Sequence, residues 1–387
     1  MDAILQTYKR ILAATPMAKK RYLFDQINWN NRLIGITGQR GTGKSTLLLQ
    51  RIKSSDNPDA YLYVSADSLF IYRHTLFEIA LSHRNMGGQY LFIDEVHRYP
   101  SWSAEIKHIY DTIPEINIVF TGSSILDIMK GYADLSRRAI HYVLSGLSFR
   151  EYLFFETDAH LPSYSIEEII SQKIKLEIDK PLFHFKNYLQ KGFFPFYTED
   201  DYDLRLLSIV NTVLEVDLIQ YLEFRPATIA KLKKLLQIIS ESVPFKPNIK
   251  KIAELTSISR ALLFHYLQYL EKAGLILLVG ASTKGIQGLS KPEKIYINNP
   301  NLCYAFGNQS TNIGNIRETF FANQLKQYTV TIPPKGDFKV NDYIFEIGGK
   351  HKTAKQIQGI ANAFLVKDDI EFGTQKTIPL WHFGFLY

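Results

Sequence analysis

Short apolar runs alternate with helical patterns between residues 32 and 124. This alternation is typical of a parallel sheet with helices on both faces. Each run ends in polar or glycine residues, where sheets of this kind bind their ligands. The predicted strands are residues 33–37, 60–64, 90–93 and 116–120, with a fifth at 141–144. We therefore expect the first half of the chain to be α/β.

The hydrophobic pattern changes in the second half. Residues 148–239 carry apolar side chains at three-to-four spacing, which predicts helices. Residues 249–279 have the pattern of helix, turn, helix and strand that a winged helix shows. The remainder combines a predicted helix at 316–328 with strands at 338–347 and 380–386. The predicted segments are an N-terminal helical segment (1–30), an α/β core (31–155), a helical lid or connector (156–240), a winged helix (245–290) and a small C-terminal α/β unit (291–387).

Composition narrows the class of protein. Of 387 residues, 46% are hydrophobic and 21% charged, which is typical of a globular chain. Cys303 is the only cysteine, so an intrachain disulfide and a cysteine metal cluster are excluded. The sequence has no signal-peptide pattern and no apolar run of about 18 residues, so we expect a cytoplasmic protein without a membrane span. The formal charge of +7 makes nucleic acid an allowed partner.

The strongest motif in the chain is a phosphate-binding loop. Residues 38–45, Gly-Gln-Arg-Gly-Thr-Gly-Lys-Ser, fit G-x-x-x-x-G-K-[ST] between a predicted strand and a predicted helix. Its glycines let successive backbone N–H groups point at phosphate oxygens, Lys44 would reach the β- and γ-phosphates, and Ser45 would ligate Mg²⁺. The residues expected to hold the nucleotide are Gly38, Gly41, Thr42, Gly43, Lys44, Ser45 and Thr46.

Acidic and hydroxyl residues follow two later strands. Asp94 ends a buried run and is placed to bind Mg²⁺, while Glu95 has the character of a general base that orients the attacking water. Thr121-Gly122-Ser123-Ser124 follows the next strand, and Ser123 or Ser124 could hold that water. The sequence thus predicts hydrolysis of ATP. A GTPase is disfavoured because no Asn-Lys-x-Asp motif occurs downstream, and the acid pair suits water attack better than a kinase reaction.

The order of these motifs resembles the AAA+ ATPases. More narrowly, it is similar to a bacterial and archaeal group in which an AAA core is joined to a winged helix and a restriction-endonuclease-like domain. The resemblance rests on residues 38–46, 94–97, 121–124, 144–153 and 291–296. It implies that Asp94 is the Walker B magnesium residue, Glu95 the catalytic glutamate and Ser124 a sensor-1 candidate.

AAA+ proteins commonly use an arginine finger, often from a neighbouring subunit, to stabilise charge on the γ-phosphate. The resemblance therefore allows a homo-oligomer. Arg138, with Arg137 beside it, is the candidate finger, and pairing with Asp127 or Asp134 is the alternative. The predicted lid offers no clear sensor-2 arginine.

The winged-helix pattern raises DNA as a partner. Ser259, Arg260, His265 and Gln268 would face outward from the second helix, and Lys246, Lys250, Lys251 and Lys272 could contact phosphates. Such domains also bind proteins, and both alternatives remain open.

The resemblance to the endonuclease fold implies a second Mg²⁺ site at Glu318, Asp337 and Glu346. Gly348 stands where the lysine of a Glu-x-Lys motif is expected, so Lys350 or Lys352 would have to bend back. This departure favours a degenerate nuclease. Three functions follow from the sequence: an ATPase coupled to a partner such as DNA, an ATP-regulated Mg²⁺-dependent nuclease, and a non-hydrolysing nucleotide switch that binds a protein.

Overall fold

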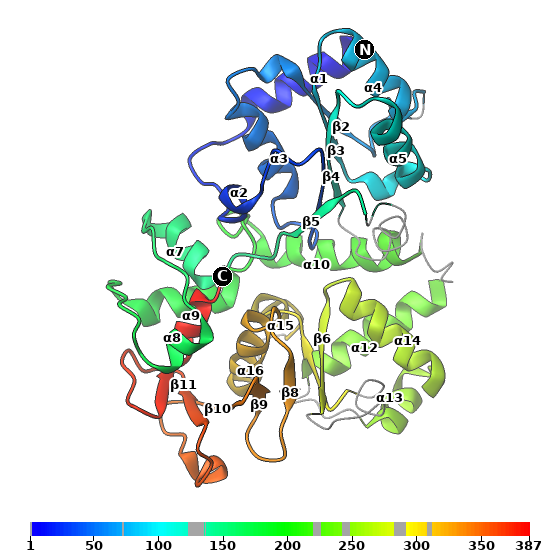
Figure 1. The fold of residues 1–387 in the computed structure, drawn as a ribbon. Helices are drawn as coiled ribbons and strands as arrows, with labels where there is room; N and C mark the ends of the chain where they lie inside the picture. Colours follow the sequence, from blue (N-terminus) through cyan, green and yellow to red (C-terminus); the bar gives the residue numbers. More distant parts are fainter. Residues whose placement is uncertain are drawn as a thin grey trace. The chain divides into compact units, whose positions relative to one another are not determined.

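The computed structural model describes residues 2–71, 73–122, 135, 137–219, 226–241, 248–281, 292–307 and 312–387. The chain forms two compact units, Met1–Gly146 and Leu147–Tyr387 (Figure 1). In the described ranges, no helix combines the length and apolar character needed to cross a membrane.

The first unit is built on a parallel five-stranded sheet in the order β2-β3-β4-β1-β5. The strands β1 to β4 are buried almost throughout, which is why they appear in the sequence as nearly continuous apolar runs. Their positions confirm the predicted α/β class. The strands are β1 (Leu33–Thr37), β2 (Tyr61–Ser65), β3 (Tyr90–Asp94), β4 (Asn117–Gly122) and β5 (Ile140–Val143).

Helices cover both faces of this sheet. Figure 1 shows α1 and α3 on one side of the strands and α4 and α5 on the other. Right-handed crossovers require this, because the chain moves outward from β1 to β2 and then returns through β3 to β4. The helices are α1 (Asp2–Ala14), α2 (Leu23–Gln26), α3 (Lys44–Lys53), α4 (Leu76–Asn85) and α5 (Trp102–Thr112), with 3₁₀ turns η1 (Pro58–Ala60) and η2 (Val96–Arg98).

The second unit begins with helices, as the three-to-four spacing predicts. A π-helical turn, η3 (Val213–Asp217), continues one of them. Several ends carry local signals, such as the capping box between Ser148 and Glu151 at the start of α7. The helices are α7 (Phe149–Thr157), α8 (Ile166–Ile170), α9 (Pro181–Lys191), α10 (Tyr202–Thr212), α12 (Pro226–Glu241), α13 (Ile249–Thr256), α14 (Arg260–Lys272), α15 (Pro300–Phe306) and α16 (Ile313–Gln324).

A mixed seven-stranded sheet organises the rest of this unit, in the order β12-β11-β10-β9-β8-β6-β7. The strand β6 pairs antiparallel with β7 on one side and parallel with β8 on the other. The hairpin after α14 is thus continuous with the C-terminal sheet, and the boundaries between the predicted lid, winged helix and C-terminal unit stay predictions. The strands are β6 (Ile276–Ala281), β7 (Lys294–Ile297), β8 (Val330–Ile332), β9 (Phe338–Val340), β10 (Tyr343–Gly348), β11 (Ala363–Lys367) and β12 (Thr377–Pro379).

The predicted strand at residues 380–386 is wrong. The structure forms a 3₁₀ helix there, η6 (Leu380–Phe385), and all six of its residues are buried. An added Cβ on Gly384 would lie 2.4 Å from Cβ of Phe149, so the backbone is pressed against α7. The run is buried on every side and lacks polar alternation, which leaves helix and strand indistinguishable by periodicity. A second short 3₁₀ turn, η5 (Ala354–Ile357), lies between β10 and β11.

Candidate nucleotide-binding site

The predicted phosphate-binding loop joins β1 to α3 at the carboxyl edge of the sheet. Gly43 precedes α3 with φ of 92°, in the left-handed region that glycine adopts without strain. Gly38 is required for a different reason, because a Cβ there would lie 2.2 Å from the carbonyl oxygen of Leu144. Side chains are thus excluded at both positions, and α3 presents the positive end of its dipole at the loop.

Lys44 is the first residue of α3 and is 4% exposed. Its Nζ donates hydrogen bonds to the carbonyl oxygens of Gly38, at 3.0 Å, and Gln39, at 2.9 Å. Thr42 is buried and also binds the Gln39 carbonyl through its hydroxyl, at 2.9 Å. The ammonium group is therefore held inside the loop by the loop's own backbone.

Asp94 ends β3 and has oriented donors on both carboxylate oxygens. Tyr63 on β2 donates its hydroxyl to Oδ2, at 2.7 Å, and Thr121 on β4 donates to Oδ1. The register explains both contacts, because Ser65 lies opposite Asp94 and Phe120 opposite Ile93. Burial and the Asp94 charge raise the pKa of Tyr63 far above its ordinary value, so its hydroxyl stays protonated and donates.

Ser45 lies next to this group, since its side chain is among those that influence the pKa of Tyr63. One chain of contacts thus links Ser45, Tyr63 and Asp94. A carboxylate and a hydroxyl are oxygen ligands of the kind that Mg²⁺ prefers, often together with water. The donor set fits a magnesium ion bound between α3 and β3.

Glu95 follows directly in a left-handed conformation, with φ of 53°. Its backbone N–H donates to the Thr121 hydroxyl, at 3.1 Å, so one threonine contacts both acidic residues. Its carboxylate Oε2 lies 3.6 Å from the Arg40 guanidinium and 3.3 Å from Nε2 of His97. The Glu95 side chain is 18% exposed, which leaves water access to it.

His97 is uncharged at neutral pH. Burial, followed by the nearby charges of Arg98, Arg40 and Lys44, lowers its pKa to about 3. A neutral imidazole with its proton on Nε2 donates a hydrogen bond to Glu95 without adding charge. Arg40 is therefore a charged neighbour of the Glu95 carboxylate, whereas His97 is a neutral one.

Arg21 contributes to the loop although its sequence context gave no indication of this. It is 5% exposed and donates to the carbonyl oxygens of Thr42, at 2.6 Å, Ser145, at 2.8 Å, and Gly146, at 3.1 Å. It thereby ties the N-terminal segment to the phosphate-binding loop and to the chain after β5. Arg40 and Tyr63 were missed as well, because Arg40 occupies a variable position of the phosphate-binding motif and Tyr63 belongs to no motif.

The other two predicted catalytic residues, Ser124 and Arg138, have different outcomes. Ser124, with its neighbour Ser123, lies outside the described residues. Arg138 makes a two-bond contact with Asp111 on α5, with distances of 3.0 and 3.1 Å, and neither predicted aspartate is its described partner. Arg137 is exposed. The arginine finger and the sensor stay predictions.

Two segments of the chain match models of known protein families. Residues 30–153 match the family model described as an AAA domain. The site thus lies in an AAA-type core with the P-loop NTPase fold. Residues 182–312 match a domain of unknown function, DUF8612, which includes the predicted winged helix.

Two relatives are both described as uncharacterized proteins of Methanocaldococcus jannaschii. MJ1637 is 29% identical over 69% of this chain and 62% of its own length, and MJ1544 is 26% identical over 70% and 66%. The chain therefore spans less than two thirds of either relative. Among solved structures, AMPPCP-bound DnaA from Aquifex aeolicus is 18% identical, covers 64% of this chain and 84% of its own, and has a TM-score of 0.25.

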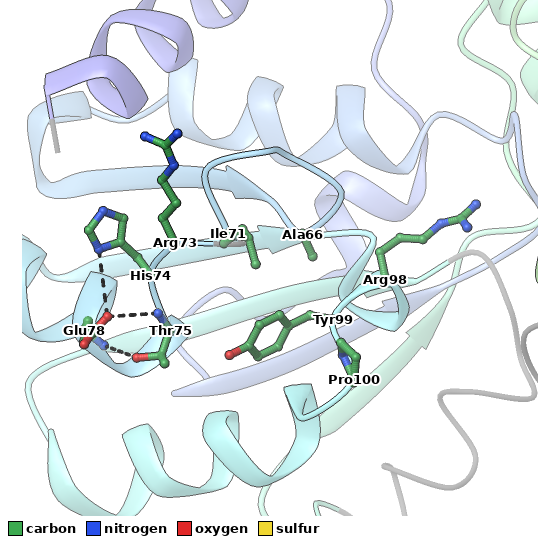
Figure 2. A pocket seen from close by; sticks show the side chains of 9 residues that line it. All are labelled: Ala66, Ile71, Arg73, His74, Thr75, Glu78, Arg98, Tyr99 and Pro100. Carbon is green, nitrogen blue, oxygen red and sulfur yellow. Dashed lines mark hydrogen bonds and ion pairs between the residues drawn. The ribbon is translucent and has the colours of Figure 1, made fainter.

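A separate pocket of about 450 Å³ opens beyond the ends of β2 and β3 (Figure 2). Tyr99 is one of the residues that line it and donates its hydroxyl to Glu105, at 2.5 Å. Figure 2 shows Arg73 and Arg98 pointing away from one another, so these two cations do not converge on a shared anion position. The lining residues are Ala66, Ile71, Arg73, His74, Thr75, Glu78, Arg98, Tyr99 and Pro100.

The predicted second magnesium site lies in the second unit. Glu318 is on α16, Asp337 directly precedes β9 and Glu346 is within β10. Lys352 bends back as the displaced motif requires, and its Nζ lies 2.6 Å from Glu346. Across the described ranges, however, no group of three or more His, Cys, Asp or Glu residues is arranged to hold a metal ion.

Proposed function

We propose that this protein binds ATP with Mg²⁺ at the carboxyl edge of the five-stranded sheet and hydrolyses it. The observation that carries the proposal is the position of the Thr121 hydroxyl, which contacts Asp94 and the Glu95 backbone together. This single group fixes a magnesium ligand and a general base relative to each other. Both stand at the sheet edge where the loop before Lys44 also lies.

Each residue has a distinct part in the proposed reaction. The loop backbone and Lys44 bind the phosphates, with the ammonium group moving from the Gly38 and Gln39 carbonyls to phosphate oxygens. Ser45 and Asp94 would hold the magnesium ion, which when bound neutralises charge on the phosphates. Glu95 orients the attacking water and accepts its proton.

Arg40 helps to orient the general base. Its guanidinium lies 3.6 Å from Oε2 of Glu95 and restricts the positions that the carboxylate can take. Nε2 of His97 lies 3.3 Å from the same oxygen, and the low pKa of this histidine keeps its ring uncharged. In this proposal the base is oriented before nucleotide binds.

Two substitutions test the assignment in the full-length protein. Lys44→Ala is expected to abolish ATP binding, because the loop loses its only lysine. Glu95→Gln is expected to retain ATP binding and lose turnover, since an amide cannot accept the proton. Binding is measured by titration calorimetry and turnover by phosphate release, with thermal unfolding of each variant as the folding control. Wild-type turnover in Glu95→Gln would refute the assignment of the base.

A second function, coupling of ATP to DNA, is favoured by the outer face of α14. Arg260, His265 and Gln268 are exposed on this helix, and Lys250 and Lys251 are exposed on α13. Such a polar and basic face suits contacts to bases and phosphates in a major groove. The face also exposes Leu262, which is 48% exposed and suits a protein partner equally well.

One experiment distinguishes a DNA partner from the alternatives. ATP turnover is measured with and without double-stranded and single-stranded DNA, over a range of salt concentrations. DNA coupling predicts stimulation that weakens as salt rises and is reduced in Arg260→Ala. Tight ATP binding without turnover under every condition would instead support a non-hydrolysing switch. Stimulation that does not change with salt would contradict phosphate contacts.

A further inference from the structure

A buried lysine lies between two acidic residues in the second unit. Lys294 on β7 has a side chain that is 5% exposed, and its Nζ lies 2.9 Å from Oε2 of Glu318 and 3.4 Å from Oδ1 of Asp337. The three residues come from β7, from α16 and from the turn before β9. One ammonium group therefore bridges three elements that are distant in the sequence.

A tyrosine, a backbone N–H group and a second lysine also contact the acidic residues of this cluster. Tyr296, two residues along β7, donates its hydroxyl to Oε2 of Glu318, at 2.7 Å. Oδ2 of Asp337 accepts the backbone N–H of Ile347, at 2.9 Å. Glu346 is fully buried, with Nζ of Lys352 at 2.6 Å from Oε1, whereas its Oε2 has no hydrogen-bond partner among the described residues. Both oxygens of Asp337 are thus occupied by groups of this chain.

The charges of the cluster nearly balance without any bound ion. Three carboxylates face two lysines, which leaves a formal charge of about −1, whereas an added divalent cation would make it about +1. Burial raises the pKa of Glu318 and of Glu346, and the lysine partners oppose this effect. Burial lowers the pKa of Lys352, but the neighbouring acids together outweigh this effect and raise the pKa, which keeps the lysine charged. The positive charge that a metal would bring is already present.

We infer that Lys294 is the resident cation of this cluster and occupies the place of a divalent metal, so that Glu318, Asp337 and Glu346 form an ion-pair joint and bind no magnesium. The joint fastens the β6–β7 hairpin to α16 and to the β9–β10 end of the sheet. This inference concerns the second unit alone and does not depend on the proposed ATPase activity.

Manganese binding to the nucleotide-free, full-length protein tests the first half of the inference. Bound Mn²⁺ is counted by electron paramagnetic resonance in the wild type and in Asp337→Asn. The asparagine keeps an oxygen for the Ile347 N–H and leaves the phosphate-binding loop unchanged, so any difference reports on this cluster. We expect the same number of bound ions in both proteins. One ion fewer in Asp337→Asn would overturn the inference.

Thermal unfolding tests the second half. Lys294→Met keeps a side chain of similar length but leaves Glu318 and Asp337 facing each other without their cation, and we expect Tm to fall by about 6–20 °C. Adding Glu318→Gln removes one of the opposed charges and should recover part of that loss. A Tm of Lys294→Met equal to that of the wild type, or no recovery in the double variant, would contradict a joint held by these charges.

Discussion

The substitution Thr121→Val tests the geometry on which the proposed hydrolysis rests. Valine has nearly the shape of threonine, and Thr121 is fully buried, so the change removes a hydroxyl without leaving a cavity. The lost hydroxyl donates to Oδ1 of Asp94 and accepts the backbone N–H of Glu95. Both acidic residues lose their shared anchor, while the phosphate-binding loop keeps its own contacts.

Thr121→Val removes two hydrogen bonds, and each contributes to the free energy of unfolding. A hydrogen bond to an ionised carboxylate contributes about 1.5–3 kcal/mol, and a neutral one about 0.5–1.5 kcal/mol. Asp94 keeps the Tyr63 hydroxyl, and water can reach the partly exposed Glu95. We therefore expect the first unit to lose about 2–4 kcal/mol in its free energy of unfolding. Loss of a residue that orients a metal ligand typically lowers activity about 10- to 100-fold, and we expect kcat to fall within that range.

Thr121→Ser is the matched control, because serine retains the hydroxyl and loses one buried methyl group, which costs about 1 kcal/mol. Chemical denaturation gives the free energies of unfolding, and phosphate release gives kcat. ATP binding should be preserved in both variants. Equal loss of turnover in the valine and serine variants would refute the argument, since it would show that the hydroxyl itself does not position the two acids.

Three further predictions address other parts of the chain. Gly38→Ala should lower kcat/KM for ATP about 100-fold, because the new Cβ would lie 2.2 Å from the Leu144 carbonyl oxygen and displace the loop; steady-state kinetics measures this. Burial lowers the pKa of His382 to about 3, below its unfolded value, so its contribution to stability is complete above pH 6.5 and is lost as pH falls toward 3. His382→Phe should therefore flatten the pH dependence of unfolding between pH 6.5 and 4.5 by about 1.4 kcal/mol per pH unit. Burial raises the pKa of Cys303 to about 12, so a thiol reagent at pH 8 should label it only after denaturation.

The sequence allowed much of the first unit to be predicted because its signals are local. A strand buried on both faces appears as an apolar run, and a phosphate-binding loop requires glycines and a lysine at fixed spacing. The expected strand at 33–37 is β1 without change, and the expected strand at 90–93 is extended only by Asp94. Local signals were enough for the fold class and for the candidate magnesium ligands.

The contacts that complete the site depend on residues far apart in the sequence. Arg21 donates to carbonyl groups 21, 124 and 125 residues away, and Tyr63 reaches an aspartate 31 residues away. Nothing around either residue distinguishes it from an exposed arginine or a core tyrosine. Lys294 illustrates the same limit, because its acidic partners lie 24 and 43 residues further along the chain. Such pairings are set by the tertiary fold and produce no periodic pattern in the sequence.

Because β6 is paired on both of its edges, the helix pair α13–α14 is difficult to isolate. A truncation after residue 297 would keep the β6–β7 pairing but strip β8 from the other edge of β6, where Gly280 and Ala281 pair with Thr331 and Ile332. Exposed strand edges recruit other chains, so the shortened protein would be prone to aggregation. The strand β6, which directly follows α14, belongs to the seven-stranded sheet. The helices α13 and α14 therefore cannot be expressed together with β6 and β7 as a separate domain without exposing an edge of that sheet.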